Sequence, residues 1–433
     1  MIVALLAALL SGASAQNPAP AARPAAPAAP AASVPGGDVT VYLMTMGTGD
    51  QVWERFGHNA IRIVDASRGT DSVYNWGTFD FHQPNFLRRF MTGNTLYWMQ
   101  GDGMEETMAT YRYLNRSVWV QELDLTPAER AAFRDFIAWS ARPENRYYRY
   151  DYYLDNCSTR VRDAIDRIVG GQLKAATASH LTGTSYRFYT QLALRDDRAV
   201  AMGTNIGLGE VADRDISQWE EAFLPAHLQR HVRSLQIRAA DGTMHSLVKN
   251  EQQLFAAQRP AAPAAPPNVT IRNAAIGVML AGLLALLSRA AQRGRGARRA
   301  FATVATIWAA LNGLLGVILI VGWAATRHAF MARNENLLQF DPLSLMLAAL
   351  LPLAIMRGRS ANLTRQLATI VAVVSIVGLA MKLLPWFAQV NVAVIAMTLP
   401  AHLVLAWAVR TLVAGAPERS TVAARATVSR SAA

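Results

Sequence analysis

Cysteine is nearly missing from this chain. Cys157 is the one cysteine among 433 residues, so an intramolecular disulfide is excluded, and with it a fold held together by disulfides. Free thiols are often inert and buried, but this one follows Asn156 at the expected start of an amphipathic helix, as the spacing of the later apolar residues indicates. The N-terminal end of such a helix lowers a thiol pKa, so we expect Cys157 to be a nucleophilic thiolate.

Charged residues are also few, at 17% of the chain, and they are concentrated before residue 260. This contrast predicts a soluble domain followed by membrane helices, and a length of 433 residues fits two or three domains. The net charge of +12 does not predict nucleic-acid binding, because many arginines lie in short loops between apolar runs, where the positive-inside rule accounts for them.

Stretches of biased composition divide the chain. Two tracts of alanine and proline contain nothing that builds a core and are expected to be extended tethers. The first residues are apolar and end in a small-x-small signal-peptidase site, although a basic N-terminal region is missing and the true start could lie upstream. The expected parts are a signal peptide or apolar segment (1–15), a linker (16–38), an extracytoplasmic thiol domain (39–258), a linker (259–269), a transmembrane domain (270–410) and a cytoplasmic tail (411–433).

The thiol domain is expected to be α+β, with its strands before the helix of the thiol. Alternating apolar residues predict strands at 39–46 and 119–125, and a hairpin of 59–64 with 72–79. A capping box at Thr126 predicts a helix that ends before Pro143. A last helical stretch is expected at about 217–235.

Apolar runs after residue 270 are each near the length that spans a bilayer. Arginines occupy the first and third loops between these runs, and they also occur in the tail. The second and fourth loops carry no net basic excess. This pattern predicts five crossings, with the thiol domain outside and the C-terminus inside; a re-entrant third run is the alternative. The runs are 272–288, 301–325, 342–356, 368–384 and 390–409.

A candidate base lies about a hundred residues before the thiol. His58 follows a Phe-Gly pair, and the expected hairpin places it opposite residues 77–78, with Asn75 nearby. A thiol, an imidazole and a polar orienting group together make an activated cysteine nucleophile. Asn75 is our candidate for the orienting group, and Asp80 and His82 compete for that role.

Other polar and aromatic residues are candidates for contacts with a substrate. Five tyrosines precede the thiol and either pack or line an acyl-chain groove. A polar loop before the third apolar run is expected on the same side of the membrane as the thiol, where it binds substrate or acts as an interfacial anchor. The candidates are Tyr153, Asn156, Arg160, His328, Asn334 and Asn336.

Two further motifs lack part of what their chemistry needs. His227 and His231 are four residues apart on an expected helix, but the glutamate of a zinc-protease helix is missing, so we interpret both as surface histidines. Gly47 and Gly49 lack the later glycine of a dinucleotide-binding motif. We therefore expect neither a metal nor a cofactor.

Together these motifs resemble those of a family of bacterial envelope proteins, the Lnb-type lipoprotein N-acyltransferases. The resemblance covers most of residues 39 to about 410, and the loop before the third apolar run departs from it by reading Phe340-Asp341-Pro342 in place of an Asn-Pro-Leu-like ending. The motifs that carry it are Phe56-Gly57-His58, Tyr74 to Phe81, Asp155 to Arg160, Gly207-Leu208-Gly209 with Asp213, Phe223-Leu224-Pro225 and His328 to Leu338.

The resemblance implies a circularly permuted papain-like (NlpC-type) thiol domain followed by about five membrane helices, with Cys157 as the nucleophile and His58 as the general base. It also implies a multi-pass protein of the bacterial inner membrane whose catalytic domain faces the periplasm. The implied acyl donor is a membrane phospholipid, and the acceptor is the N-terminal amine of a diacylglyceryl-cysteine lipoprotein. The acyl chain would pass through a cysteine thioester, which an amine cleaves more readily than an ester.

Two other functions remain open from the sequence. A periplasmic cysteine peptidase or amidase that acts on cell-wall peptides would use the same thiol, but it has no need of five membrane helices. A non-enzymatic membrane protein would tolerate the loss of the thiol.

Overall fold

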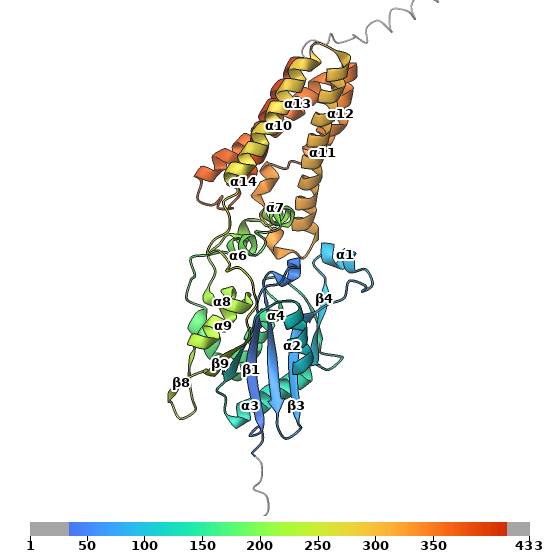
Figure 1. The fold of residues 1–433 in the computed structure, drawn as a ribbon. Coiled ribbons are helices and arrows are strands. Elements are labelled where there is room, and N and C mark those ends of the chain that lie inside the picture. The colour runs from blue at the N-terminus through green and yellow to red at the C-terminus, as the bar shows by residue number, and fades with distance from the viewer. Residues whose placement is uncertain (1–33, 414–433) are drawn as a thin grey trace, which may run out of the picture.

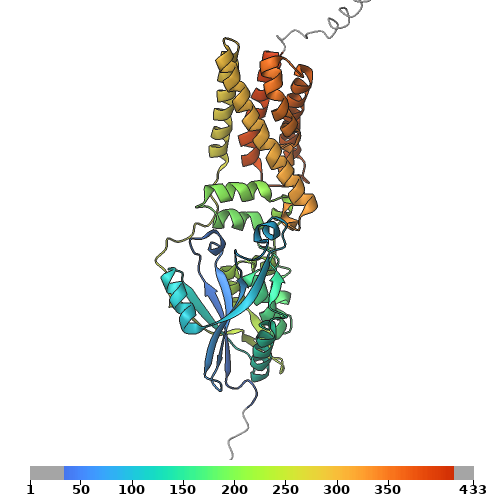
Figure 2. The same cartoon turned by 90° about the vertical axis from the view of Figure 1, so that its right-hand side faces the viewer.

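The chain folds into two parts that stand end to end, a soluble α+β part and a bundle of long helices (Figure 1 and Figure 2). The computed structural model describes residues 34–413. The predicted signal peptide, nearly all of the first linker and the tail beyond residue 413 lie outside the described residues. Within them, an α+β domain comes first and four or five apolar helices follow, which confirms the predicted fold class.

An antiparallel sheet forms the centre of the soluble part. Its strands within residues 34–413 are, in sheet order, β6 (Tyr147–Arg149), β4 (Leu96–Gly103), β3 (Thr70–Thr78), β2 (His58–Asp65), β1 (Val39–Met46), β5 (Val118–Leu123) and β9 (Val248–Phe255). The predicted strands are confirmed as β1, β2, β3 and β5, and the predicted hairpin as the pair of β2 and β3. The other strands escaped prediction because β9 is mostly polar, β4 ends in a glycine-rich stretch and β6 is very short.

Short helices and a second hairpin surround the sheet. They are α1 (Phe86–Met91), α2 (Met104–Tyr113), α3 (Pro127–Ser140), α4 (Cys157–Ile168), α5 (Gln172–Thr177), α6 (Tyr186–Ala193), α7 (Arg198–Gly207), α8 (Gln218–Glu221), α9 (Pro225–Ser234), β7 (Gln236–Arg238) and β8 (Met244–Ser246). The predicted capping box is confirmed, since Thr126 and Glu129 exchange hydrogen bonds at the start of α3. The predicted stretch 217–235 is divided into α8 and α9, because Pro225 begins a new helix.

The main core lies between the sheet and helices α3, α4 and α9. Leu43 and Ile61 of the sheet are buried there together with Phe133 of α3 and Ile165 of α4. Full burial of each such side chain stabilises the fold by about 1.5–3 kcal/mol. This layer therefore fixes α4 firmly against β2 and β3.

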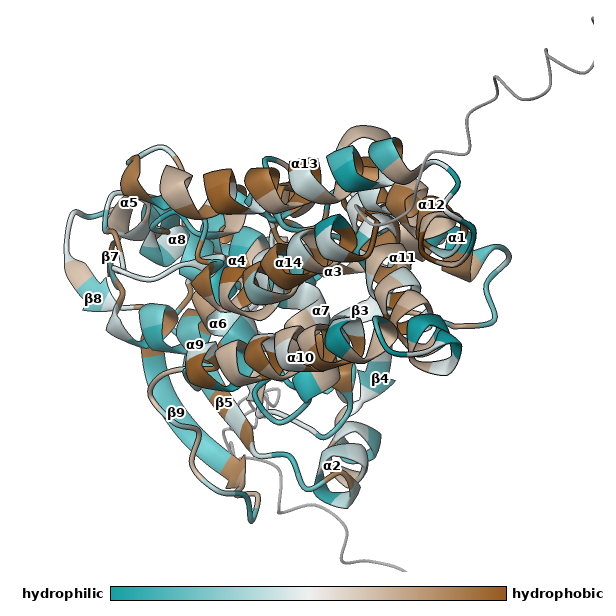
Figure 3. Cartoon of the chain, turned by 90° about the horizontal axis from the view of Figure 1, so that it is seen from above, coloured by the Kyte–Doolittle hydropathy of each residue, from teal (hydrophilic) through white to brown (hydrophobic). Residues whose placement is uncertain are grey.

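The bundle contains the predicted apolar runs. Its helices are α10 (Thr270–Ala291), α11 (Arg295–Ala325), α12 (Leu343–Arg357), α13 (Ala361–Ala380) and α14 (Val392–Val413). Among the described residues, four helices are long and apolar enough to cross a membrane, and α12 makes a fifth span if it is joined to the bent segment before it. Figure 3 shows apolar residues along α10, α13 and α14. The arginine-rich loop between α10 and α11 lies at the end of the bundle away from the soluble part (Figure 2), as the positive-inside rule requires of an inward loop.

The loop between α11 and α12 holds the soluble part against the bundle. The N–H of Gly209 donates to the carbonyl oxygen of Phe330 at 2.7 Å, and a Cβ on Gly209 would overlap the backbone of the same loop. The buried amides of Asn334 and Asn336 donate to the carbonyl oxygen of Ile206 in α7, at 2.9 and 3.0 Å. Because the Nδ2 donors of both buried amides are paired with carbonyl oxygens across the interface, the two parts are costly to separate.

Candidate active site

Two neighbouring side chains lock the helix of the thiol to the strand of the histidine. α4 begins at Cys157, since Asn156 caps it as predicted, and β2 begins at His58. The residues that follow each of them, Ser158 and Asn59, form a buried contact of 2.7 Å between Oγ and Oδ1. This contact fixes His58 and Cys157 relative to each other.

Cys157 and His58 both approach Gly77 of β3. Gly77 lies at a bulge with a φ of +108°, a conformation that glycine adopts readily. A Cβ placed on Gly77 would lie 3.3 Å from Cβ of Cys157 and 3.9 Å from Cε1 of His58. The structure therefore brings the predicted nucleophile and the predicted base to one point, and a residue without a side chain leaves room for them.

A chain of hydrogen bonds orients the imidazole. Nε2 of His58 lies 3.0 Å from Oδ1 of Asn75, and Nδ2 of Asn75 donates to the carboxylate of Asp102 at 3.3 Å. The carboxylate of Asp102 can only accept, so it binds the NH₂ group of Asn75 and leaves the amide oxygen facing His58. That oxygen is an acceptor, so Nε2 of His58 carries the proton and Nδ1 keeps its lone pair. Of the predicted orienting groups, Asn75 is thus the one that contacts His58, whereas Asp80 and His82 bind each other at the surface.

Burial keeps both groups neutral. It is the largest effect on Cys157 and raises the pKa of the thiol above its ordinary value, although the backbone N–H groups of Asn59 and Ser158 oppose it. Burial, assisted by the positive charge of Arg116, lowers the pKa of His58 to about 4. The predicted low pKa of the thiol is therefore wrong, because desolvation outweighs the effect of the helix N-terminus.

A buried tyrosine hydroxyl lies at the same point. Tyr148 of β6 is 7% exposed, and its hydroxyl has no hydrogen-bond partner among residues 34–413. It lies 4.0 Å from the position beside Gly77 that Cys157 and His58 approach. Burial and the negative charge of a Cys157 thiolate raise the pKa of Tyr148 well above 10, so the phenol stays protonated. The hydroxyl is thus a donor available to a substrate oxygen.

An apolar cavity of about 700 Å³ begins at Cys157 and reaches the loop that follows α11. Its size lies within the range of roughly 300–1,000 Å³ that is typical of small-molecule sites. Aromatic and aliphatic side chains form most of its wall, and few charged groups face it. The cavity therefore suits a long apolar group better than a peptide or a sugar.

A continuous series of aromatic rings follows the cavity wall from the thiol to α1. Tyr150 and Tyr97 stack with ring centres 4.1 Å apart, and burial raises the pKa of both phenols. Phe79 stacks on Tyr97 at 4.9 Å, and Phe86 of α1 follows at 6.4 Å. The ring series thus links the surroundings of Cys157 to the surface of the soluble part that is nearest the bundle.

The predicted substrate contacts divide into two groups. Tyr153, Asn156 and His328 line the cavity, although Asn156 also caps α4 and the hydroxyl of Tyr153 is hydrogen-bonded to Thr190. Arg160 lies behind the site, with its guanidinium 4.2 Å from the ring centre of Tyr148 and paired with Asp155. The structure does not bring Asn334 and Asn336 to the cavity wall either, because their amides bind α7.

The residues that sequence reasoning missed are Tyr148, Asp102 and Gly77. Tyr148 was noticed only as one of five clustered tyrosines, and nothing in the sequence separates it from its neighbours. Asp102 lies on β4, which was not predicted, so its approach to Asn75 could not be foreseen. Gly77 carried a signal, since a glycine inside a predicted strand marks a bulge or a close approach.

The two histidines with metal-like spacing have a shared partner. Nε2 of His231 and Nδ1 of His227 lie 2.8 and 2.9 Å from the carboxylate of Glu221. His231 is buried, so its prediction as a surface histidine is wrong. The error arose because Glu221 lies on α8, a separate helix, whereas a single helical stretch was predicted for α8 and α9 together.

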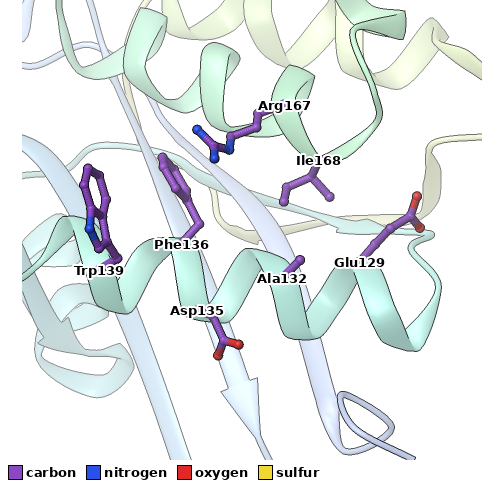
Figure 4. Close-up of a pocket in the computed structure, with 7 residues that line it drawn as sticks. All are labelled: Glu129, Ala132, Asp135, Phe136, Trp139, Arg167 and Ile168. Carbon is purple, nitrogen blue, oxygen red and sulfur yellow. The ribbon is translucent and has the colours of Figure 1, made fainter.

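A second pocket, shown in Figure 4, lies between α3 and the end of α4. Arg167 stacks on Phe136 there, and Glu129 belongs to the capping box of α3. The pocket contains neither a thiol nor a histidine. It therefore offers none of the nucleophilic chemistry found around Cys157.

The comparison with known families agrees with this geometry. Residues 26–191 match the model of the Lnb N-terminal periplasmic domain, and residues 273–411 match the model of the Lnb transmembrane domain. The chain belongs to the Lnb-type lipoprotein N-acyltransferase family. Like the domains described for Lnb, it is membrane-anchored with an extracytoplasmic domain, and the family indicates a lipoprotein-processing enzyme. No curated protein and no solved structure matches the chain.

Proposed function

We propose that this protein moves a fatty acyl chain from a membrane phospholipid to the N-terminal amine of a diacylglyceryl-cysteine lipoprotein, through a thioester on Cys157. We also propose that it does so in the bacterial inner membrane, with the thiol on the periplasmic side. The observation that carries the proposal is the apolar cavity that joins Cys157 to the membrane-facing end of the soluble part. A hydrolase of cell-wall peptides would need a polar groove at this place.

The first half of the reaction uses the neutral pair of Cys157 and His58. Nδ1 of His58 accepts the thiol proton as the sulfur attacks the ester carbonyl carbon of the phospholipid. The tetrahedral intermediate then expels the glycerol oxygen, which takes the proton back from His58 and leaves as a lysophospholipid. The acyl chain remains on the sulfur as a thioester.

The second half reverses these roles. The amine of the lipoprotein attacks the thioester carbonyl, and His58 accepts a proton from the nitrogen. The thiolate leaves and is protonated again by His58, which gives an amide and the free enzyme. Both substrates are anchored in the bilayer, so a membrane-bound enzyme meets them at high effective concentration.

The oxyanion of each tetrahedral intermediate needs donors. We assign this role to the backbone N–H of Cys157 and to the hydroxyl of Tyr148, which lies unpaired at the reacting point. A preorganised donor at such a position typically contributes about 3–4 kcal/mol of transition-state stabilisation.

Mass spectrometry tests the proposal. Purified protein incubated with phospholipid but without an amine acceptor should gain the mass of one acyl chain on Cys157, and hydroxylamine should remove it. The Cys157→Ser variant is the control that cannot form a thioester. In cells, loss of the protein should leave lipoprotein N-termini without the amide-linked chain. An unmodified Cys157 in protein that turns over substrate would contradict the covalent route.

A further inference from the structure

Helix α1 exposes an unusual amount of apolar surface. No residue of α1 is buried, and Leu87, Phe90 and Met91 are 68%, 57% and 63% exposed. Trp53 and Phe81 lie beside the helix, are also exposed, and contact each other edge to face. A six-residue helix that buries nothing gains little from folding in water, which points to a partner that covers these side chains.

The position of α1 identifies that partner. α11 ends at Ala325, and the N–H of Arg327 donates to the carbonyl oxygen of Thr92 at 3.0 Å, directly after α1. Nε2 of His328 donates to the carbonyl oxygen of Phe90 at 3.0 Å. α1 is thus fastened to the end of α11 that is nearest the soluble part, and α11 is long and apolar enough to cross a membrane (Figure 1).

The charge of this region fits a phospholipid surface. Arg88 and Arg89 lie on α1 itself, and α1 carries no acidic residue. Arg327 adds a third positive charge where α1 meets the bundle. Apolar side chains together with arginines are the composition of a segment that lies in the membrane interface, with its guanidinium groups at the phosphates.

The same surface opens into the reactive cavity. Trp53, Phe81, Leu87 and Phe90 are exposed and also belong to the cavity wall. The ring series from Tyr150 ends at these residues. A chain that left the leaflet between them would reach Cys157 without crossing water.

We propose that α1, with Trp53 and Phe81, inserts into the outward leaflet of the membrane and forms the mouth through which a phospholipid acyl chain enters the cavity. The insertion rests on the exposed surface and on its attachment to α11. The role of the mouth rests, in addition, on the proposed acyl transfer.

Two methionines with similar exposure provide a matched test. Met91 lies on α1, and Met244, which is 53% exposed, lies on β8 at the end of the soluble part remote from the bundle (Figure 1). In the full-length Cys157→Ser protein, Met91→Cys and Met244→Cys each provide a single thiol for a nitroxide label. The labelled proteins are reconstituted in phosphatidylethanolamine and phosphatidylglycerol nanodiscs. Collisions with oxygen, which partitions into lipid, are then compared with collisions with a water-soluble nickel chelate.

We expect the label at Met91 to collide several-fold more with oxygen than with nickel, and the label at Met244 to show the reverse. Equal nickel access at both positions would overturn the insertion of α1. This readout needs no turnover, so it is independent of the proposed function.

The role of α1 as the mouth is tested in the protein with Cys157 intact. Met91→Asp should lower acyl transfer from bilayer phospholipid several-fold, whereas Met244→Asp should not. Unchanged transfer by Met91→Asp would overturn the role of α1 as the mouth.

Discussion

Replacing Tyr148 with phenylalanine separates the proposed catalytic role of its hydroxyl from any structural role. The substitution removes one oxygen atom and keeps the ring, which packs in the main core and stacks against Arg160. Since the hydroxyl has no partner among residues 34–413, no hydrogen bond of the folded state is lost. The expected effects on activity and on stability therefore have opposite signs.

The magnitudes follow from the surroundings of the hydroxyl. Loss of one oxyanion donor typically costs about 3–4 kcal/mol of transition-state stabilisation, so kcat should fall about 100- to 1,000-fold in Tyr148→Phe. KM should change little, because the donor acts on charge that appears only in the transition state. A buried hydroxyl without a partner costs about 1–3 kcal/mol, so the variant should unfold at a higher temperature than the wild type.

The assay measures initial rates of acyl transfer from phospholipid to a diacylglyceryl-cysteine peptide, together with thermal unfolding of the same samples. Tyr147→Phe is the matched control, because Tyr147 is the preceding residue of β6, is 51% exposed and binds Arg146 instead of the site. A Tyr148→Phe protein with wild-type kcat would refute the oxyanion role. A loss of kcat that is accompanied by a lower unfolding temperature would show that the hydroxyl is structural.

Three further changes test the rest of the site. Asn75→Ala should lower kcat about 100-fold, the usual effect of a misplacement of roughly 1 Å, and should leave the extent of alkylation of Cys157 unchanged. Gly77→Ala should destabilise the fold by about 1–3 kcal/mol and abolish transfer, because its Cβ would crowd Cys157, whereas Gly69→Ala, also at positive φ but in open space, should keep its activity. Because burial lowers the pKa of folded His58 to about 4, below its unfolded value of 6.5, its contribution to stability is complete above pH 6.5 and is lost as the pH falls toward 4. Urea unfolding should show this loss, and His58→Gln should remove that part of the pH dependence.

The local features of the site could be predicted from the sequence, but the contacts between segments that are far apart in the chain could not. Period-two alternation identified β2 and β3, and a two-strand register alone was enough to place His58 near Asn75. The cap at Asn156 identified the start of α4. These features depend on neighbouring residues, so a single sequence carries them.

Features that depend on distant segments were missed or wrongly assigned. The pKa of the thiol was expected to be low because helix position is visible in a sequence, whereas the burial that outweighs it comes from segments far along the chain. Asn334 and Asn336 were expected to contact the substrate because they are polar residues in a loop predicted on the same side of the membrane as Cys157. Their amide N–H groups instead donate to a backbone carbonyl oxygen of α7, and no pattern of side chains in the sequence predicts such a contact.

The neutrality of the resting pair fits a site that works in an apolar cavity. A thiolate and an imidazolium enclosed with a lipid chain would both lack solvation, so burial favours the uncharged thiol and imidazole. In the proposed reaction, charge appears only when a carbonyl carbon is in place to receive the sulfur. At that moment the unpaired hydroxyl of Tyr148 and the lone pair on His58 gain their partners together. Once the thioester has formed, the apolar wall of the cavity limits the access of water to it, which favours transfer to an amine over hydrolysis.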